Sequence, residues 1–529
     1  MRETLQLVKF ILRRERVSLT IWVVAIVGFV VYMPFLYEGL YPTIADRYAA
    51  MMMMANPAIV AIVGPSTGAY TLGAILTQEV LLVTIIAMGI MNILLVNRHT
   101  RVDEELGRLE LIRSFPVEST SILQAVFIVV VVVNVLIGGV SAVGLALSGV
   151  ESVTTSGSIL FGAVLTVSGL LFATITAVCA QAFSTAKGSS GYAFMAFLVM
   201  YMVRAIGDVG GNFLSYISPL GLLLQTRTFV DDLWWPIVVV LVQVMVLGGL
   251  SVYLVSRRDL GVGLIPAKPG PREAAKSLLS VGGLAWRLQR GSLIVWTIGT
   301  FLIGIAYGAV IGEVEAYIGE NEMIQMMLAS VGSGDASGPE QFIPFLILFL
   351  VIVLLIPIVG PILRLAGEEK RNLSEHLLAR VVSRSGLLWS YFLISMIASV
   401  VLLVAGGFGV WLSGTLALDD PIALSTLMGA LLVYLPATWL LIGLAVVLVG
   451  WLPKLAGLTT LIIGFIFFIS FLGGLLDLPE FVMNLSPLTH VPALPVDEFS
   501  IVSFLAMSVI AVVLMVAGFI GYNRRDVQG

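Results

Sequence analysis

Apolar residues gather along the chain into long runs, separated by shorter stretches of charged and glycine-rich sequence. A helix that crosses the ~30 Å hydrocarbon core of a bilayer needs about 20 consecutive apolar residues, because its backbone groups find hydrogen-bond partners only within the helix. Twelve runs meet this requirement. They cover residues 17–37, 72–96, 121–147, 159–183, 191–206, 235–256, 291–311, 342–363, 387–413, 424–451, 455–476 and 499–522. The pattern therefore predicts an all-α polytopic membrane protein with twelve transmembrane helices.

The distribution of Lys and Arg predicts which side of the membrane each loop occupies. With the N-terminus in the cytoplasm, all 28 Lys and Arg except Arg47, Arg204 and Arg227 fall in cytoplasmic segments. Cytoplasmic loops of membrane proteins are enriched in Lys and Arg, so both termini are expected in the cytoplasm. The first run follows the basic segment 1–16 and is longer than the ~7–15 apolar residues of a cleavable signal, so it is expected to remain as a span.

Polar residues between the runs indicate an internal duplication. Ser218-Pro219-Leu220, an acidic pair, a span and Arg257-Arg258-Asp259 recur in the same order as Ser486-Pro487-Leu488, an acidic pair, a span and Arg524-Arg525-Asp526. Each half holds six predicted spans, so both halves enter and leave on the same side and form parallel repeats. The predicted organisation is a first half at 1–260, a cytoplasmic linker at 261–271 and a second half at 272–529.

The segments ahead of the first and seventh spans are predicted to be amphipathic elbow helices on the membrane surface. In the segment 1–16, Leu5, Val8 and Leu12 share one face among basic residues, and in 272–290 apolar residues alternate with charges. The alternative is a charged flank that anchors the following span.

Composition narrows the classes of function. With 59% hydrophobic and 11% charged residues and a mean hydropathy of +1.06, the chain lacks the polar surface that a water-soluble protein of 56.7 kDa needs. A net charge of −4 with dispersed basic residues argues against nucleic-acid binding. A single Cys and three scattered His favour neither a disulfide nor a metal site, and no cofactor is expected in this chain.

Two charged cytoplasmic segments, 97–120 and 364–386, correspond to each other. Glu104 and Glu369 lie the same 265 residues apart as Glu110 and Glu375. Both segments are amphipathic, with acidic residues followed by basic ones, which a simple connection between spans does not require.

These segments resemble the coupling segments of ABC-2 type exporter permeases. The duplicated six-span half and the segment 51–65 resemble the long, fused subgroup known as exporters of polyketide antibiotics, over essentially the whole chain. The resemblance implies the ABC-2, or type V exporter, fold in a prokaryotic cell membrane. It also implies outward transport of hydrophobic or amphiphilic compounds between the halves, driven by separate ATPase subunits that hold ATP and Mg²⁺, two per permease chain.

The same resemblance assigns acidic residues of both segments to ATPase coupling. They are Asp103, Glu104, Glu105, Glu110, Glu368, Glu369 and Glu375. Asn372 and His376 depart from the family pattern, which allows the two docking surfaces to differ in strength.

The source of energy for transport has two possible interpretations. No Gly-Lys dipeptide occurs, so the chain has no P-loop, and we expect a transport subunit rather than an enzyme. The alternative is a proton-driven secondary multidrug carrier, although few acids or His lie at the predicted membrane midplane. A membrane enzyme acting on lipid-linked substrates has little support, because no interfacial cluster of carboxylates, His and nucleophiles is evident.

Ionisable residues inside the predicted spans are candidate substrate-path or gate residues. Glu79 is interpreted equally as a hydrogen-bonded structural acid or as a group lining a cavity for cationic substrates. Arg204 and Asp208 are spaced to pair with each other, which we prefer to a gating role. From the family resemblance, the Ser-Pro-Leu segments are expected to form short re-entrant helices at an outer gate. Gly304, Gly308 and Gly312 predict close packing of the seventh span against a neighbour.

Overall fold

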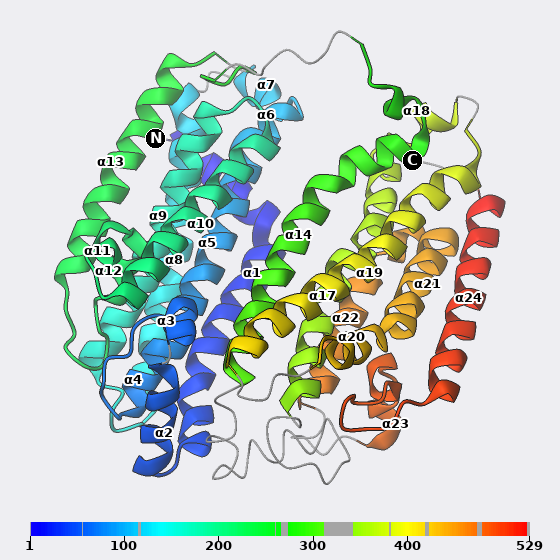
Figure 1. The fold of residues 1–529 in the computed structure, drawn as a ribbon. Coiled ribbons are helices and arrows are strands. Elements are labelled where there is room, and N and C mark those ends of the chain that lie inside the picture. Colours follow the sequence, from blue (N-terminus) through cyan, green and yellow to red (C-terminus); the bar gives the residue numbers. More distant parts are fainter. Residues whose placement is uncertain are drawn as a thin grey trace. The chain divides into compact units, whose positions relative to one another are not determined.

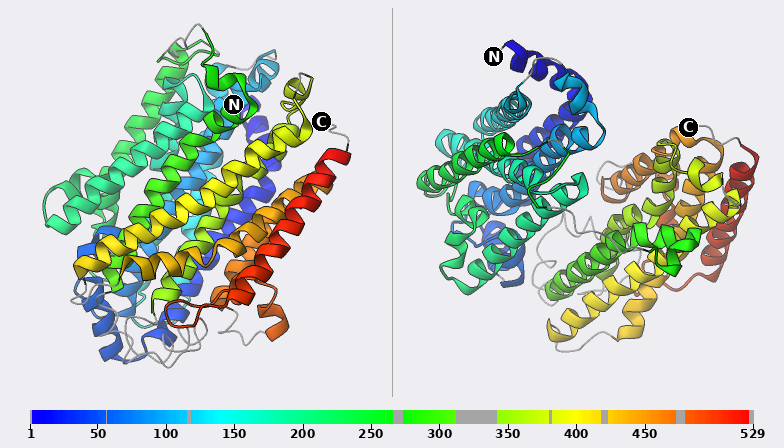
Figure 2. Two further views of the ribbon diagram at one scale, coloured as in Figure 1. Left: turned by 45° about the vertical axis from the view of Figure 1, so that its right-hand side comes forward. Right: turned by 90° about the horizontal axis from the view of Figure 1, so that it is seen from above.

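The computed structural model describes residues 2–55, 57–114, 118–259, 261–265, 273–311, 342–379, 382–417, 423–472 and 479–525. Regular secondary structure in this part of the chain is helical, apart from one isolated bridge between Phe183 and Ile265. The chain divides into two compact units, residues 1–270 and 271–529. Figure 1 labels their helices, and Figure 2 shows them from two further sides.

The first unit is built from long apolar helices joined by short ones. The long helices are α1 Arg2–Leu40, α5 Leu82–Asn97, α8 Ser119–Ala146, α9 Thr155–Ala182, α10 Ala186–Gly210 and α13 Trp235–Arg257. The short ones are α2 Ile44–Met54, α3 Pro57–Val63, α4 Leu72–Leu76, η1 Thr77–Leu81, η2 Arg98–Val102, α6 Asp103–Glu105, α7 Arg108–Arg113, α11 Leu214–Ile217 and α12 Pro219–Leu224. The π-helical turns η1 and η2 adjoin the two ends of α5.

Helix α9 lies at the centre of this unit, where it packs against α5, α8, α10 and α13. Small residues let it approach α8 closely, since a Cβ on Gly138 would lie 2.3 Å from the Gly162 carbonyl oxygen. Beside this contact, the buried amides of Asn92 on α5 and Asn134 on α8 exchange hydrogen bonds of 2.9 and 2.8 Å. The interior of the first unit therefore combines close backbone contact with a satisfied polar pair.

The second unit follows a similar plan. Its long helices are α14 Val281–Ile311, α17 Phe342–Glu369, α19 Arg384–Ala417, α21 Leu435–Trp451, α22 Leu458–Leu472 and α24 Ile501–Arg524. The short ones are η3 Lys276–Leu279, α18 Glu375–Leu378, α20 Leu424–Leu432, η5 Pro453–Leu455, α23 Glu480–Met483 and η6 Pro487–His490. The predicted span 424–451 is divided into α20 and α21, because Pro436 lacks a backbone N–H and its ring conflicts with the carbonyl of Leu432.

The predicted glycine stripe packs α14 against α19. A Cβ on Gly304 would lie 2.3 Å from the Gly406 carbonyl oxygen, and one on Gly308 would lie 2.2 Å from the Val410 carbonyl oxygen. The Ser413 hydroxyl donates a hydrogen bond of 2.6 Å across the same contact to the Ile305 carbonyl. The packing prediction is confirmed for Gly304 and Gly308. Gly312 lies outside the described residues.

Eleven continuous helical stretches in the described part of the chain are long and apolar enough to cross a membrane, which confirms a polytopic membrane protein. Two of them join consecutive elements, namely α4 to α6 over Leu72–Glu105 and α20 with α21 over Leu424–Trp451. The eleven stretches coincide with eleven of the twelve predicted spans. The remaining span, 455–476, corresponds to the shorter α22, and its last residues lie outside the described part. A total of twelve spans therefore stays a prediction.

The predicted elbow helices are largely continuous with the spans in the residues that the structure describes, although the short η3 precedes α14 within the second one. Helix α1 runs without a break from Arg2 to Leu40, and α14 continues from Val281 into the next predicted span. The first proline of α1 is Pro34, so no missing backbone donor interrupts its helical hydrogen bonds near residue 16. The charged flank and the apolar run therefore form one helix in each unit.

Candidate functional site

The first predicted coupling segment continues directly from the helix of the second span. After α5, the chain passes through η2 and α6 and reverses at Gly107, whose φ of 69° lies in the left-handed region. Glycine adopts this conformation without the steric cost that a Cβ brings. Helix α7 then leads back and carries Glu110 in its first turn. The result is a helical hairpin at the end of α5.

Glu104 joins this hairpin to the segment that follows α13. Its two carboxylate oxygens accept hydrogen bonds of 2.8 Å from Nη1 and Nη2 of Arg258. The backbone N–H of Gly261 donates a third bond at 2.7 Å, and Arg101 donates a fourth at 2.8 Å. Only 6% of the Glu104 side chain is exposed. This carboxylate is therefore fully engaged within the chain.

The neighbouring acids join the same hairpin to two further helices. Asp103 accepts two hydrogen bonds from Arg14 of α1, at 2.6 and 3.0 Å, and a third from Arg108 at 2.9 Å. Glu105 accepts a 2.6 Å bond from the backbone N–H of Ala186, the first residue of α10. A carboxylate is favourable at this position because the N-terminus of a helix carries partial positive charge.

The second unit repeats the central contact. Helix α17 ends at Glu369, and the chain turns at Asn372, whose φ is 59°. Asn372 lies 265 residues after Gly107, the spacing that also relates Glu104 to Glu369. Glu369 is 6% exposed and accepts hydrogen bonds of 2.5 Å from Arg525 and from the Tyr522 hydroxyl.

A buried glutamate of each coupling segment thus binds the arginine that follows the last helix of its own half. We call these two pairs, Glu104–Arg258 and Glu369–Arg525, the carboxylate clamps. The repeated Arg-Arg-Asp sequence was a visible signal for them, because it recurs at the same place in both halves. The partners themselves were not predicted.

Around the clamps, the two halves differ. In the first unit His99 is buried, with Nε2 3.2 Å from Glu15 and Nδ1 3.6 Å from Asp103. Arg364 takes the position of His99 in the second unit and donates a 3.0 Å bond to Glu368. Glu368 also accepts a hydrogen bond from the Tyr391 hydroxyl. These surroundings make the two coupling segments electrostatically unequal.

Two predicted coupling acids point to the exterior of their units. Glu110 and Glu375 are exposed, and large exposed apolar side chains lie near them in sequence, namely Leu106, Leu111 and Leu373. A cavity of about 470 Å³ adjoins Glu375 and is also lined by Leu378, Val382, Ser383 and Arg384. Each coupling segment therefore has an internal set of paired carboxylates and an external acidic and apolar surface.

Glu79 makes the hydrogen bonds that one of its two interpretations requires. It lies in η1, where the Tyr37 hydroxyl donates to it at 2.5 Å and the Tyr41 hydroxyl at 3.5 Å. Both tyrosines belong to the end of α1 or directly follow it. The contacts join the start of the second span to the end of the first.

Arg204 and Asp208 form the predicted pair, with Nη1 and Oδ2 3.4 Å apart, and both side chains are buried. The Arg204 guanidinium also donates to the carbonyls of Ala61 and Ile62 and lies over the Tyr201 ring, 4.6 Å from its centroid. These contacts attach α3 to α10, which is a structural task.

Among the residues that the structure describes, no three His, Cys, Asp or Glu side chains are grouped so as to hold a metal ion. The buried acids described above are matched by Arg, Tyr or backbone donors.

Comparisons with known proteins agree with a transport role. The sequence model of a family described as the C-terminal domain of the multidrug efflux system permease Rv1217c matches residues 278–523. Over 531 aligned residues the chain is 34% identical to the multidrug efflux system permease protein Rv1217c of Mycobacterium tuberculosis (strain ATCC 25618 / H37Rv), covering 99% of this chain and 95% of that protein. The chain therefore belongs to the family of this multidrug efflux system permease.

Proposed function

We propose that this chain is the membrane-spanning permease of an ABC-type exporter for hydrophobic or amphiphilic drug-like compounds. Separate ATPase subunits would bind the coupling segments 97–120 and 364–386 and supply the energy. Family membership supports a drug-efflux permease, and the sequence resemblance to ABC-2 permeases supports the ATPase partnership. The observation that carries the proposal is the pair of carboxylate clamps, formed in the same way in both halves.

The coupling acids divide into two roles in this proposal. Glu110 and Glu375 are exposed and contact the ATPase, together with the nearby exposed leucines. Glu104 and Glu369 are buried and hold the coupling segment to the end of the last helix of the same half. A displacement of the segment is therefore passed to α13 or α24 as well as to α5 or α17.

A buried ion pair can hold the coupling segment firmly to the last helix of its half. Removing one partner of a buried pair costs about 3–5 kcal/mol, because the other charge is left uncompensated. Separating the pair would leave both charges without partners in a buried site, so we expect the clamps to hold through a transport cycle. Alternating access then follows from ATP-driven closure of the two ATPase subunits, with substrate passing between the halves.

The test uses the permease purified together with any ATPase that co-purifies with it from its native host, placed in liposomes. We expect Glu110→Ala combined with Glu375→Ala to abolish ATP-dependent drug efflux and to lower the amount of co-purified ATPase at least tenfold. Glu151→Ala combined with Glu480→Ala is the control, because these acids are also exposed but lie on predicted outer segments. Wild-type efflux in the Glu110 and Glu375 variant would refute docking at these surfaces.

The proton-driven carrier remains the second candidate, and buried His99 between two carboxylates is the observation in its favour. The two candidates differ in their response to energy depletion. Efflux from cells depleted of ATP but holding a proton gradient should cease for an ABC-type permease. Continued efflux under these conditions would support the carrier.

A further inference from the structure

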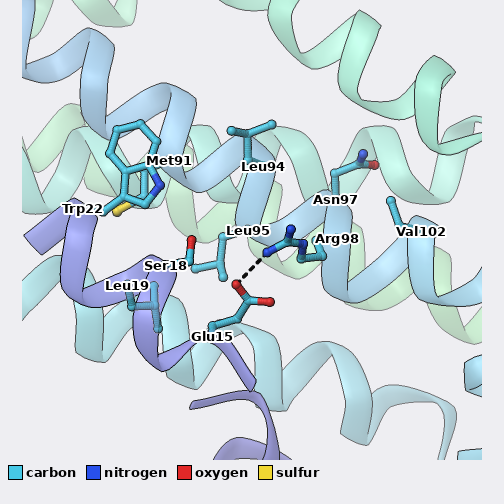
Figure 3. A pocket seen from close by; sticks show the side chains of 10 residues that line it. All are labelled: Glu15, Ser18, Leu19, Trp22, Met91, Leu94, Leu95, Asn97, Arg98 and Val102. Carbon is cyan, nitrogen blue, oxygen red and sulfur yellow. Dashed lines mark hydrogen bonds and ion pairs between the residues drawn. The ribbon is translucent and has the colours of Figure 1, made fainter. Parts of the chain in front are cut away.

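A small cavity opens between α1 and α5 in the first unit, beside the coupling segment (Figure 3). Its volume is about 270 Å³. Residues of α1, α5 and η2 line it, namely Glu15, Ser18, Leu19, Trp22, Met91, Leu94, Leu95, Asn97, Arg98 and Val102. Asn97, Arg98 and Val102 belong to the predicted coupling segment, but none of its candidate coupling acids lines the cavity.

The lining changes from polar to apolar along the two helices. Figure 3 shows Glu15 facing Arg98 and Trp22 beside Met91. Glu15 and Trp22 are seven residues apart on α1, a separation of about 10 Å at 1.5 Å per residue. The cavity therefore matches an amphiphile, with a charged group at one end and an apolar portion along the other.

The exposed charge at the polar end is the Arg98 guanidinium. One Glu15 oxygen accepts a hydrogen bond of 2.8 Å from Arg98, the other lies 3.2 Å from Nε2 of His99, and the Glu15 side chain is only 4% exposed. Arg98 binds Glu15 through Nη1, and 53% of its side chain remains exposed. A guanidinium has five N–H donors in a planar fork, which fits the oxygens of a phosphate.

The charged groups near Arg98 also favour an anionic ligand. Asp103, which faces His99 from η2 and α6, is bound by Arg14 and Arg108. In the second half Leu363 takes the position of Arg98, because it lies 265 residues later. The Arg98 position itself is therefore cationic in the first half alone.

We propose that this cavity binds one anionic phospholipid, with its phosphate on Arg98 and the first part of an acyl chain along Trp22 and Met91. Tryptophan is enriched where a membrane meets water, and basic pockets between transmembrane helices bind anionic headgroups. The proposal does not depend on the ATPase partnership. A lipid here contacts both α1 and the start of the coupling hairpin.

Native mass spectrometry of the full-length chain tests the proposal, with phosphatidylglycerol and phosphatidylcholine of identical acyl chains as probes. We expect one retained phosphatidylglycerol with about fivefold preference over phosphatidylcholine, and about fivefold weaker binding in Arg98→Gln. Arg257→Gln is the matched control, since it removes an arginine from the same end of the unit and keeps the cavity. Equal retention of both lipids by the wild-type chain would overturn the proposal.

A second variant leaves the Arg98–Glu15 pair intact. Trp22→Ala removes the apolar wall, and we expect it to release the same phosphatidylglycerol molecule while the thermal unfolding midpoint stays close to that of the wild type. Decanoate is added as a second probe, to test whether the cavity binds a free fatty acid instead of a phospholipid. Retention of phosphatidylglycerol by both variants at wild-type levels, or binding of decanoate without phosphatidylglycerol, would refute the assignment.

Discussion

Glu104 and Glu110 lie on either side of the turn at Gly107, yet one is buried and the other is exposed. Glu104 is buried and binds Arg258 through both oxygens, whereas Glu110 is exposed. The same division separates Glu369 from Glu375 in the second half. Because charge is costly to bury without a partner, the two kinds of acid have different energetic consequences when they are removed.

Glu104→Ala should therefore destabilise the protein while Glu110→Ala should not. The first change leaves Arg258 and Arg101 without their shared carboxylate and should cost about 3 kcal/mol. The second removes a solvated charge and should cost less than about 0.5 kcal/mol. Thermal unfolding in detergent measures both. Equal unfolding midpoints for the two variants would contradict the clamp.

The two left-handed turns provide a second matched pair. Gly107→Ala places a Cβ at a φ of 69° with no heavy atom within 4 Å of it, so its cost is conformational and about 1 kcal/mol. Asn372→Gly removes a Cβ from a φ of 59° and should leave stability unchanged or slightly higher. A higher unfolding midpoint for Gly107→Ala, or a lower one for Asn372→Gly, would contradict left-handed backbone conformations at these turns.

Helix α14 illustrates how an element depends on small residues at one face. Gly304 and Gly308 meet the backbone of α19, while Gly299 of the same helix has no heavy atom within 4 Å of an added Cβ. Gly-x-x-x-Gly spacing lets two helices approach closely in a membrane, where tight packing replaces the hydrophobic driving force.

Gly304→Val should therefore loosen the contact between α14 and α19, at a cost of about 1–3 kcal/mol from overpacking. Gly299→Val makes the same chemical change on the same helix and should be tolerated. Unfolding midpoint and size-exclusion profile of each variant provide the readout. Comparable loss in both variants would mean that helix propensity, rather than the α19 contact, sets the effect.

Over the whole chain, each of the two units has one external acidic and apolar surface at its predicted coupling segment. Glu110 is exposed in the first half and Glu375 at the corresponding position of the second, while the clamp glutamates are buried. The surroundings of the clamps differ, with His99 in one half and Arg364 in the other. Under the proposed ATPase partnership, two copies of the ATPase are expected to bind these surfaces with unequal strength.

The mass of the purified complex should correspond to one permease chain with two ATPase subunits. Glu110→Ala or Glu375→Ala alone should leave about one subunit bound, because each change affects one surface. Light scattering coupled to size-exclusion chromatography measures the stoichiometry. A wild-type complex with a single ATPase subunit would refute the symmetric arrangement.

The sequence alone determined the features that depend on residues close to one another along the chain. Apolar runs predicted eleven of the helices long enough to cross a membrane, and the spacing of Gly304 and Gly308 predicted close helix packing. The Arg204–Asp208 pair also followed from its spacing of one helical turn. All these signals lie within a single helix, where hydrophobicity and periodicity are sufficient.

Only the tertiary structure decided which of the predicted coupling acids are buried. Arg258 lies 154 residues from Glu104, and Arg14 lies 89 residues from Asp103, so neither partner follows from local spacing. The continuity of α1 through the predicted elbow was likewise outside the reach of the charge pattern, because the same pattern suits a surface helix and the end of a long span. Burial and ion pairing arise when distant helices pack together, and that packing separates the held carboxylates from the exposed ones.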